Sequence, residues 1–322
     1  MKTKKYLFLA AAAMAFAACS NDDDAVNAPV EARIMAGVNT PETRALNNQW
    51  EQDAIGVMVT EVSGTTQGVT SVMKDLYKNV KYTTTANSAA AATFTSEGEG
   101  IFFQDANETV TFAAYAPYQE SAANALPGTN GVIEGSTADQ GDRTKQQAFD
   151  YIYASGATAT RSNPTVQFQA TNAFMHKMTR LVIIVKTSAQ DGFTAEQVTS
   201  GTYSLSGLNH SGLFDVTTGT AQATGTTVTD DWSLTSNSLK TEGETDQVTF
   251  TSILYPQTLT DNLTFKAVID GQTYTNNTIK PDLDPRKSNT VTITVKKTGL
   301  TISGCIVSDW GNGNDYIGDA TM

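Results

Sequence analysis

Hydrophobic and polar residues alternate along most of the chain, and no segment beyond the N-terminus carries a sustained apolar stripe with helical spacing. A period of two is typical of β-strands that have one buried face. Many short strands separated by turn residues predict an all-β fold built of antiparallel sandwiches. The clear strand candidates are residues 54–62, 109–118, 165–170, 180–187, 248–256, 262–270, 289–297 and 300–307.

Three shorter features complete this pattern. Asp270-Gly271 lies between two alternating runs and predicts a tight hairpin. A short helix or irregular stretch is expected around residues 73–78, and a long polar loop at residues 119–147. The chain that follows the first 18 residues is long enough for about two domains of roughly 100–200 residues each.

The first 18 residues contain lysines, an apolar run from Tyr6 to Phe16 and two alanines directly before Cys19. This order predicts a secretory signal peptide. The apolar run is shorter than the roughly 20 residues that a membrane-spanning helix needs. We therefore expect residues 1–18 to be absent from the mature protein.

Phe-Ala-Ala-Cys at residues 16–19 resembles a bacterial lipobox, which implies that the Cys19 thiol receives a diacylglycerol and becomes the new N-terminus. The alternative is an ordinary signal peptide that is cut near Ala18 and leaves Cys19 as a free thiol. The acidic run at residues 20–24 resembles the tag that directs Bacteroidetes lipoproteins to the outer face of the outer membrane. The same run also suits a solvated tether.

The chain has a net charge of −12, which becomes about −15 without the three lysines of the signal. An acidic surface repels phosphate backbones, so we expect no nucleic acid partner. Of the two cysteines, Cys305 has no partner for an intrachain disulfide if Cys19 is lipidated. The fold must then be stabilised by core burial.

Residue types that catalyse reactions or bind metals are sparse. The two histidines, His176 and His210, lack a metal-ligand spacing such as HExxH, and nucleophile and phosphate-loop motifs are missing from the sequence. We expect no catalytic residues, no cofactor and no metal, and a structural, hydrogen-bonded role for His176.

Carboxylates at residues 230–231 and 282–284 are expected to cap turns; a hydrolase would need such pairs to converge in a pocket. Residues 309–319 do not match an EF-hand loop. Core or domain-interface positions, rather than a sugar platform, are expected for Trp50, Trp232 and Trp310.

Six segments occur in the order seen in a known family: residues 43–59, 110–118, 149–154, 174–185, 253–259 and 291–313. With them the chain resembles the fimbrillin family of Bacteroidetes, the subunits of type V pili. The resemblance implies two tandem transthyretin-like antiparallel β-sandwich domains, which we place at residues 45–172 and 173–322. Residues 284–293 depart from the turn that many relatives carry before the penultimate strand.

The segment at residues 30–38 alternates apolar residues on one face and is expected to form a sheet-edge strand. A polar loop at residues 39–44 follows, of the kind that proteases reach easily. An arginine-specific, trypsin-like protease that cuts between Arg44 and Ala45 would release the lipidated tether and the strand, residues 19–44, in one step. Arg33 is a second basic site, but a cut there leaves half of the strand behind. The alternative is that Arg44 is an ordinary surface arginine.

Loss of that strand would expose unpaired backbone groups and an apolar groove, which an extended segment of the next subunit could fill. The candidate donor is residues 300–310, with Leu300, Ile302 and Ile306 expected on one face and Cys305 and Val307 on the other. Head-to-tail contacts of this kind generate open filaments. The alternative is an ordinary strand that stays within its own domain.

The sequence therefore predicts a structural subunit of a cell-surface fimbria that is exported as an outer-membrane lipoprotein, processed, and assembled outside the cell by donor-strand exchange. Its expected partners are other fimbrial subunits, the protease, the outer membrane before processing, and a host or bacterial surface receptor. The alternative function is a surface lipoprotein that does not polymerise and acts as a tip adhesin, an anchor or a glycan-binding module.

Overall fold

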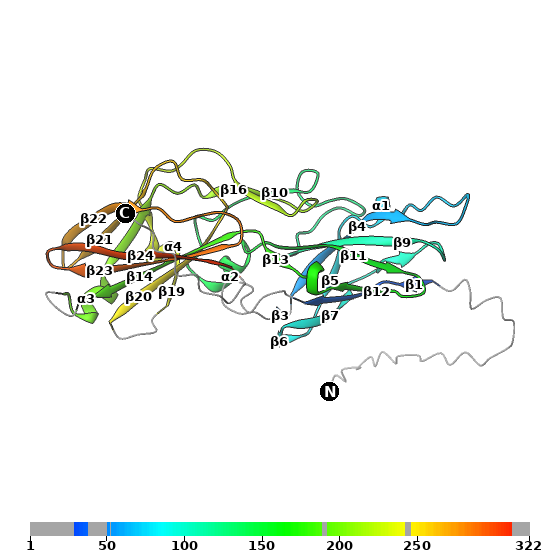
Figure 1. Ribbon diagram of the computed structural model, residues 1–322, viewed down its shortest axis with the longest axis horizontal. Helices are drawn as coiled ribbons and strands as arrows, with labels where there is room; N and C mark the ends of the chain where they lie inside the picture. Colours follow the sequence, from blue (N-terminus) through cyan, green and yellow to red (C-terminus); the bar gives the residue numbers. More distant parts are fainter. Residues whose placement is uncertain (1–28, 38–49, 52, 189–191, 242–245, 311–322) are drawn as a thin grey trace, which may run out of the picture.

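The computed structural model describes residues 29–37, 50–51, 53–188, 192–241 and 246–310. Figure 1 shows an elongated molecule in which one group of strands follows another along the long axis. Strands make up most of both groups, and the helices are short, so the all-β prediction is confirmed. Each group encloses its own cluster of buried hydrophobic side chains.

The first lobe is built from strands in the order β12-β2-β7-β5-β4-β9-β11-β13. All neighbours are antiparallel except β2 and β12, which are parallel. The bounds are β2 Arg33–Gly37, β4 Ala54–Ser63, β5 Val80–Thr83, β7 Ala91–Ser96, β9 Thr109–Ala116, β11 Ile152–Thr160, β12 Thr165–Phe168 and β13 Met175–His176. Two small pairs lie beside them: β1 (Val30–Glu31) with β8 (Phe102–Phe103), and β3 (Trp50–Glu51) with β6 (Asn87–Ala89).

The second lobe contains two sheets, in the orders β19-β20-β14-β23-β24 and β18-β15-β21-β22. Neighbours are again antiparallel, except the parallel pair β14 and β23. The hairpin at Asp270-Gly271 joins β21 to β22, and both residues have the positive φ that a type I′ turn requires. The bounds are β14 Thr179–Thr187, β15 Thr202–Ser206, β18 Trp232–Ser233, β19 Leu239–Thr241, β20 Gln247–Leu254, β21 Leu263–Ile269, β22 Gln272–Ile279, β23 Lys287–Lys296 and β24 Gly299–Asp309.

The two lobes are joined through residues 119–147, which are more ordered than the polar loop that the sequence predicts. They contain β10 (Val132–Ser136), which pairs with β16 (Ser211–Asp215), and β16 pairs in turn with β17 (Thr220–Ala223). The expectation of a loop was wrong here because Val132 and Ile133 give too short an apolar run, and the pairing partner lies far along the chain. A third buried cluster combines residues of both lobes, including Tyr115 and Tyr153 with Phe214 and Tyr255.

One edge of the larger sheet in the second lobe is closed by glutamine side chains. β19 pairs with β20 only as far as Thr251. Beyond it, the Gln140 amide accepts from the Ile253 N–H and donates to the Ile253 carbonyl, both at 2.7 Å. The Gln146 amide donates to the Thr251 carbonyl at 2.9 Å. Because these groups take the place of a neighbouring strand, this part of the edge has no backbone free to pair with another chain.

The helices of the described residues are single turns or little more. The short helix expected at residues 73–78 is present as α1 (Met73–Leu76). α3 begins with a capping box, in which the Thr194 hydroxyl accepts from the Gln197 N–H and the Gln197 side chain accepts from the Thr194 N–H. Within the described ranges, no helix has the length and apolar character needed to cross a bilayer. The remaining bounds are α2 Arg143–Gln147, α3 Ala195–Ser200, α4 Leu234–Asn237 and the 3₁₀ turn η1 Ala170–Asn172.

Candidate functional site

The N-terminal strand β2 is an internal strand, and the prediction of a sheet-edge strand was wrong. It pairs antiparallel with β7, where Ile34 lies opposite Phe94, and parallel with β12, where Ile34 lies opposite Val166. An edge strand would have one of these neighbours. The reason lies in β12, which follows more than a hundred residues later and covers the side of β2 that local sequence leaves open.

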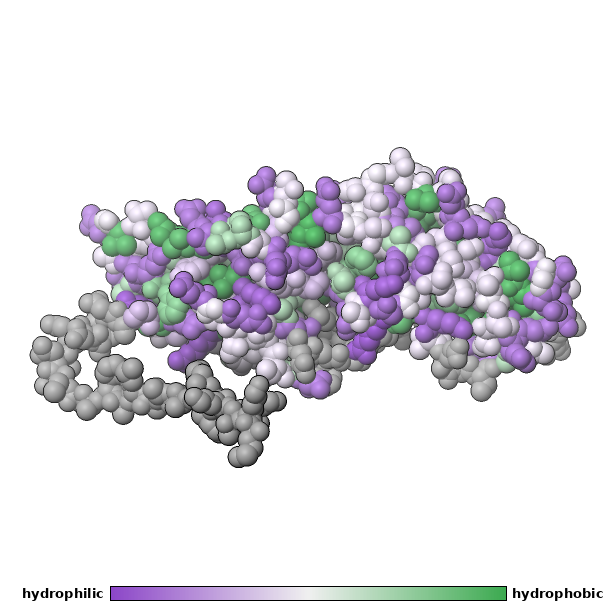
Figure 2. Space-filling model, turned by 180° about the vertical axis from the view of Figure 1, so that it is seen from behind, coloured by the Kyte–Doolittle hydropathy of each residue, from purple (hydrophilic) through white to green (hydrophobic). Residues whose placement is uncertain are grey.

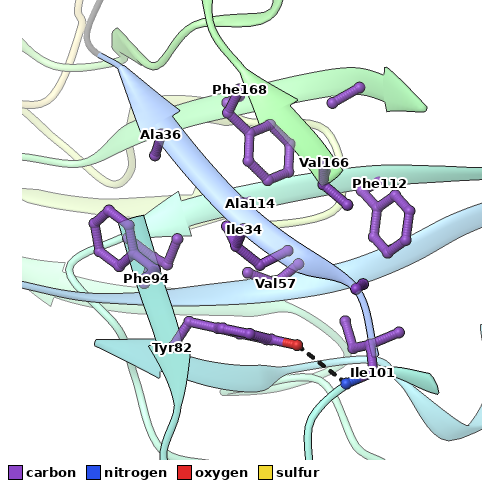
Figure 3. Packing of buried hydrophobic residues seen from close by; sticks show 14 of the residues in the cluster. Ile34, Ala36, Val57, Tyr82, Phe94, Ile101, Phe112, Ala114, Val166 and Phe168 are labelled. Atoms are coloured by element: carbon purple, nitrogen blue, oxygen red, sulfur yellow. Dashed lines mark hydrogen bonds between the residues drawn. The ribbon is translucent and has the colours of Figure 1, made fainter. Parts of the chain in front are cut away.

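The alternation in this segment does place its apolar face in the core. Ala32, Ile34 and Ala36 are at most 2% exposed, while Arg33 between them is exposed. Figure 3 shows Ile34 and Ala36 pointing from β2 into the first hydrophobic cluster. Burial of the Ile34 side chain alone stabilises the fold by about 1.5–3 kcal/mol.

Backbone hydrogen bonds hold both ends of this strand. The Ala32 N–H donates to the Ile101 carbonyl at 2.8 Å, and the Phe174 N–H donates to the Gly37 carbonyl at 3.2 Å. The Ile101 N–H in turn donates to the Tyr82 hydroxyl at 3.0 Å, drawn as a dashed line in Figure 3. Burial raises the pKa of Tyr82, so this phenol stays neutral across the physiological range.

The predicted lipidation and processing residues, Cys19, Arg44 and Ala45, lie outside the described residues. The described chain stops at Gly37 and resumes at Trp50. The Trp50 indole N–H donates to the Ala36 carbonyl at 3.1 Å. The two described ends that flank residues 38–49 therefore lie close together, and β2 has no other covalent link to the chain that follows it.

The C-terminal strand β24 lies at the outer edge of its sheet, beside β23. The expected arrangement of its faces was wrong. A bulge shifts the register between Ile302 and Cys305, so that Leu300, Ile302 and Cys305 all pack against the second core. Ile306, which was expected to share a face with Leu300 and Ile302, is 41% exposed. The extra residue at the bulge, Gly304 with a φ of +129°, reverses the faces of the residues after it.

Trp310, the residue directly after β24, is 3% exposed and belongs to the cluster between the lobes. Its indole stacks on the imidazole of His176, with ring centroids 3.9 Å apart. The Arg180 guanidinium lies 5.4 Å from the indole centroid. His176 is buried and its Nδ1 lies 2.6 Å from the Asp150 carboxylate, which agrees with the predicted hydrogen-bonded role. Sequence reasoning missed Asp150, although it directly precedes the tyrosines of the 149–154 segment.

The other residues singled out in the sequence occupy structural positions. Trp50 and Trp232 are buried in the first and second clusters, as predicted. The Asp284 N–H donates to the Asp282 carboxylate at 3.1 Å, the turn geometry expected there. Asp231 pairs with Lys266 at 2.7 Å. Within the ranges that the structure describes, no three histidine, cysteine or acidic side chains are grouped as a metal site would require.

Burial shifts the protonation of two further groups. It lowers the pKa of His210 to about 4, and the ring, 4.4 Å from the Trp232 ring, remains neutral at pH 7. It raises the pKa of the Cys305 thiol to about 11. Both shifts follow from structural positions, since the His210 side chain is buried and Cys305 packs against the second core.

The surface is polar with isolated apolar positions. Figure 2 shows one face of the molecule, on which hydrophobic residues lie scattered among hydrophilic ones. A hollow of about 430 Å³ in the second lobe is lined by polar or small side chains, among them Asn209, Gln257 and Asp284. Across the described part of the chain, the exposed large hydrophobic side chains are Val69, Val72, Leu76, Val228 and Ile306.

Comparison with solved structures supports this fold. A protein from Bacteroides ovatus, described as "a putative cell adhesion protein", superimposes with a TM-score of 0.69 at 24% identity, over 88% of this chain and 98% of that one. A second protein of the same description, from Bacteroides uniformis, gives a TM-score of 0.63 at 24% identity over the same shares. At this identity the likeness establishes the fold alone.

Sequence comparison identifies the family. A curated relative from Bacteroides uniformis, named "Putative fimbrium subunit Fim1C", is 28% identical over 250 residues, which are 76% of this chain and 75% of that protein. The family model described as "Fimbrillin-like" matches residues 43–310. This match spans both lobes, from the segment that precedes Trp50 to Trp310. The chain therefore belongs to the fimbrillin-like family.

Proposed function

We propose that this chain is a fimbrial subunit that is exported as a lipoprotein on Cys19, cut between Arg44 and Ala45, and assembled by insertion of a strand from a neighbouring subunit. The observation that carries the proposal is the position of β2. It is a fully packed internal strand, yet it joins the rest of the fold only through residues 38–49. One cut in that segment would leave β2 held by non-covalent contacts alone.

The two candidate arginines differ in their access to a protease. Arg33 lies within β2, its N–H bonded to the Pro164 carbonyl at 2.8 Å and both neighbouring strands in place. A protease would have to unfold the sheet to reach that bond. The sequence around Arg44 contains a proline and polar residues, which favours it as the site.

Departure of β2 would leave a slot with open backbone groups on β7 and β12 and a row of exposed core side chains. Such a slot favours a new extended segment, because main-chain hydrogen bonds supply affinity and alternating side chains supply register. β24 is the candidate donor, since it lies at a sheet edge and is covered by one neighbour, β23. A chain that both lacks a strand and supplies one forms an open filament.

One observation favours the alternative of a tip or anchor subunit that keeps its last strand. Trp310 is buried between His176 and Arg180, so β24 is fixed at its C-terminal end to the junction of the lobes. A subunit with a retained β24 would accept a strand but not donate one. It would end a fimbria instead of extending it.

The test compares Arg44→Ala with the matched variant Arg33→Ala, both in the full chain. After treatment with an arginine-specific protease, we expect the Arg33→Ala protein to begin at Ala45 and to form a ladder of polymers on a gel without boiling. Arg44→Ala should keep its N-terminus and stay monomeric. Polymers of undiminished length from Arg44→Ala would refute the processing step. Complete processing to Ala45 without any polymer would favour the terminal subunit.

A further inference from the structure

We propose that the occupant of the β2 slot is the segment Ile302–Asp309 of a second copy of this chain, in a single register that places Ile306 where Ile34 was. The inference rests on the proposed function, since it takes the slot to be emptied and refilled. The proposal adds which side chains fill the slot, takes the segment to run in the direction of β2, and explains why shifted registers in that direction do not fit.

The two segments match position by position. Val30–Gly37 reads VEARIMAG, and Ile302–Asp309 reads ISGCIVSD. Aligned without a gap, the inward-facing positions pair the partly buried valine with isoleucine, alanine with glycine, isoleucine with isoleucine, and alanine with serine. The segment that would arrive therefore repeats the sizes of the segment that would leave.

The slot imposes a strict order of sizes on its occupant. Its three innermost positions hold Ala32, Ile34 and Ala36, each at most 2% exposed. Cores are packed to high density, so a large side chain at either alanine position would collide with the surrounding cluster. An occupant must therefore present a small, a large and a small side chain at alternate positions. Gly304, Ile306 and Ser308 do so.

Shifted registers fail this requirement. A shift that brings Ile302 to the Ile34 position places Leu300 on the first small site. The opposite shift brings Ile306 and Trp310 to the two small sites and Ser308 to the large one. A shift by one residue turns the strand over and offers Cys305 at the large site, with Ser303 and Val307 beside it.

In its own sheet, β24 does not bury Ile302 and Ile306 on the same face. The bulge at Gly304 turns Ile306 outward, where it is 41% exposed, because Leu300, Ile302 and Cys305 occupy the core side. The ladders of β2 with β7 and β12 run without a register shift. In the slot the segment would straighten, and Ile302, Gly304 and Ile306 would then share one buried face.

The register also fixes the neighbours of Cys305, the only cysteine that remains after cleavage at Arg44. Cys305 would take the place of Arg33, which lies opposite Thr165 of β12. Val307 would take the place of Met35, which lies opposite Gln167. Neighbouring positions on paired strands fall within the Cα separation that a disulfide spans.

A disulfide between Cys305 and a cysteine introduced on β12 therefore reports the register of the inserted strand directly. The full chain is prepared as Thr165→Cys and as Gln167→Cys, processed at Arg44, allowed to polymerise, and oxidised with oxidised glutathione. We expect Thr165→Cys to give intersubunit bands that survive boiling and collapse to monomer with reductant. Gln167→Cys is the matched control on the same face of β12, two residues further on, and should give at least about tenfold less of these bands.

Each outcome decides between the inference and its alternatives. Crosslinking through Gln167→Cys in place of Thr165→Cys would reject this register and direction, because a shift by two residues or a reversed strand brings Cys305 there. Polymers that crosslink through neither variant would reject Ile302–Asp309 as the occupant. Both results leave the proposed function standing. Processed chains that never polymerise would reject the proposed function and the register together.

A second pair of variants tests the role of Ile306. Ile306→Asp and Val228→Asp replace aliphatic side chains that are each 41% exposed in the monomer, so both proteins should melt like the unaltered chain. We expect Ile306→Asp to lower the polymer yield by at least about tenfold and Val228→Asp to leave it unchanged. Equal polymer yields from the two would overturn the assignment of Ile306 to the slot.

Discussion

The indole of Trp310 lies parallel to the imidazole of His176, with 3.9 Å between the ring centroids and 10° between the ring planes. His176 belongs to β13, which is paired with β11 of the first lobe, whereas Trp310 directly follows β24, the last strand of the second lobe. The stack therefore connects the C-terminal strand to the opposite lobe. Any departure of β24 from its own sheet has to break this contact.

The replacement Trp310→Ala should release the end of β24. We expect a loss of about 3–5 kcal/mol in the free energy of unfolding, because a large buried ring is removed and a cavity remains between His176 and Arg180. Denaturant unfolding measures this loss, and limited proteolysis should cut β24 sooner. Trp310→Phe keeps an aromatic ring over His176 and should lose clearly less. Equal stability of the alanine variant and the unaltered chain would show that the stack does not hold the strand.

The replacement Ile34→Ala should destabilise only the unprocessed chain. Truncation of a fully buried isoleucine costs about 2–5 kcal/mol, and Ile34 contributes it only while β2 is in place. After cleavage at Arg44 and departure of the strand, the variant and the unaltered chain should unfold alike. Thermal melting before and after processing makes the comparison. Met35→Ala, on the opposite and half-buried face of β2, is the control with the smaller expected loss.

His210 should make the fold sensitive to mild acid. Its pKa is lowered by burial from 6.5 to about 4, so between these values the unfolded chain binds a proton that the folded chain does not. The free energy of unfolding therefore falls as the pH falls through this window, by on the order of 3 kcal/mol from this residue. His210→Asn should remove that part of the slope in urea unfolding at pH 7 and pH 4.5. Parallel pH profiles for the two proteins would contradict the assignment.

Cys305 should react slowly in the monomer. Burial raises its pKa from 9.0 to about 11, which lowers the thiolate fraction at pH 8 by roughly 100-fold. Alkylation of the monomeric Arg44→Ala chain by iodoacetamide, followed by mass spectrometry of the peptide that contains Cys305, should be slow in buffer and fast in urea. In a polymer with the proposed register, Cys305 would occupy the exposed place of Arg33 and should react faster than in the monomer.

The strands with a clear alternating pattern could be predicted from the sequence. All eight segments named from alternation contain strands, and the predicted hairpin at Asp270-Gly271 joins one of them, β21, to β22. Prediction failed where a strand has a short apolar pattern and pairs with a strand far along the chain. β10 has two large apolar residues, Val132 and Ile133, and its partner β16 lies some eighty positions further along the chain. Local sequence carries no signal of such a pairing.

At the candidate site too, the local alternation of residues could be predicted, whereas the pairing of distant strands could not. The buried face of β2 follows from the alternation of Ala32, Ile34 and Ala36, and the structure confirms it. That β2 is internal depends on the parallel strand β12, and the reversal of faces in β24 depends on a bulge at Gly304. Both are set by tertiary pairing. A glycine within a strand can mark a bulge, so Gly304 was the available signal in the sequence for the reversal of faces in β24.

The ladder between β10 and β16 gives a pulling force a second path between the lobes, beside the chain that connects β13 to β14. Figure 1 shows the two strands running along the long axis, and five residue pairs from Val132 with Asp215 to Ser136 with Ser211 join one lobe to the other. Tension applied at the two ends would load these hydrogen bonds in shear, so that they must yield together and not one after another. In a fibre that holds a cell in flowing liquid, this ladder would therefore resist separation of the two lobes under tension.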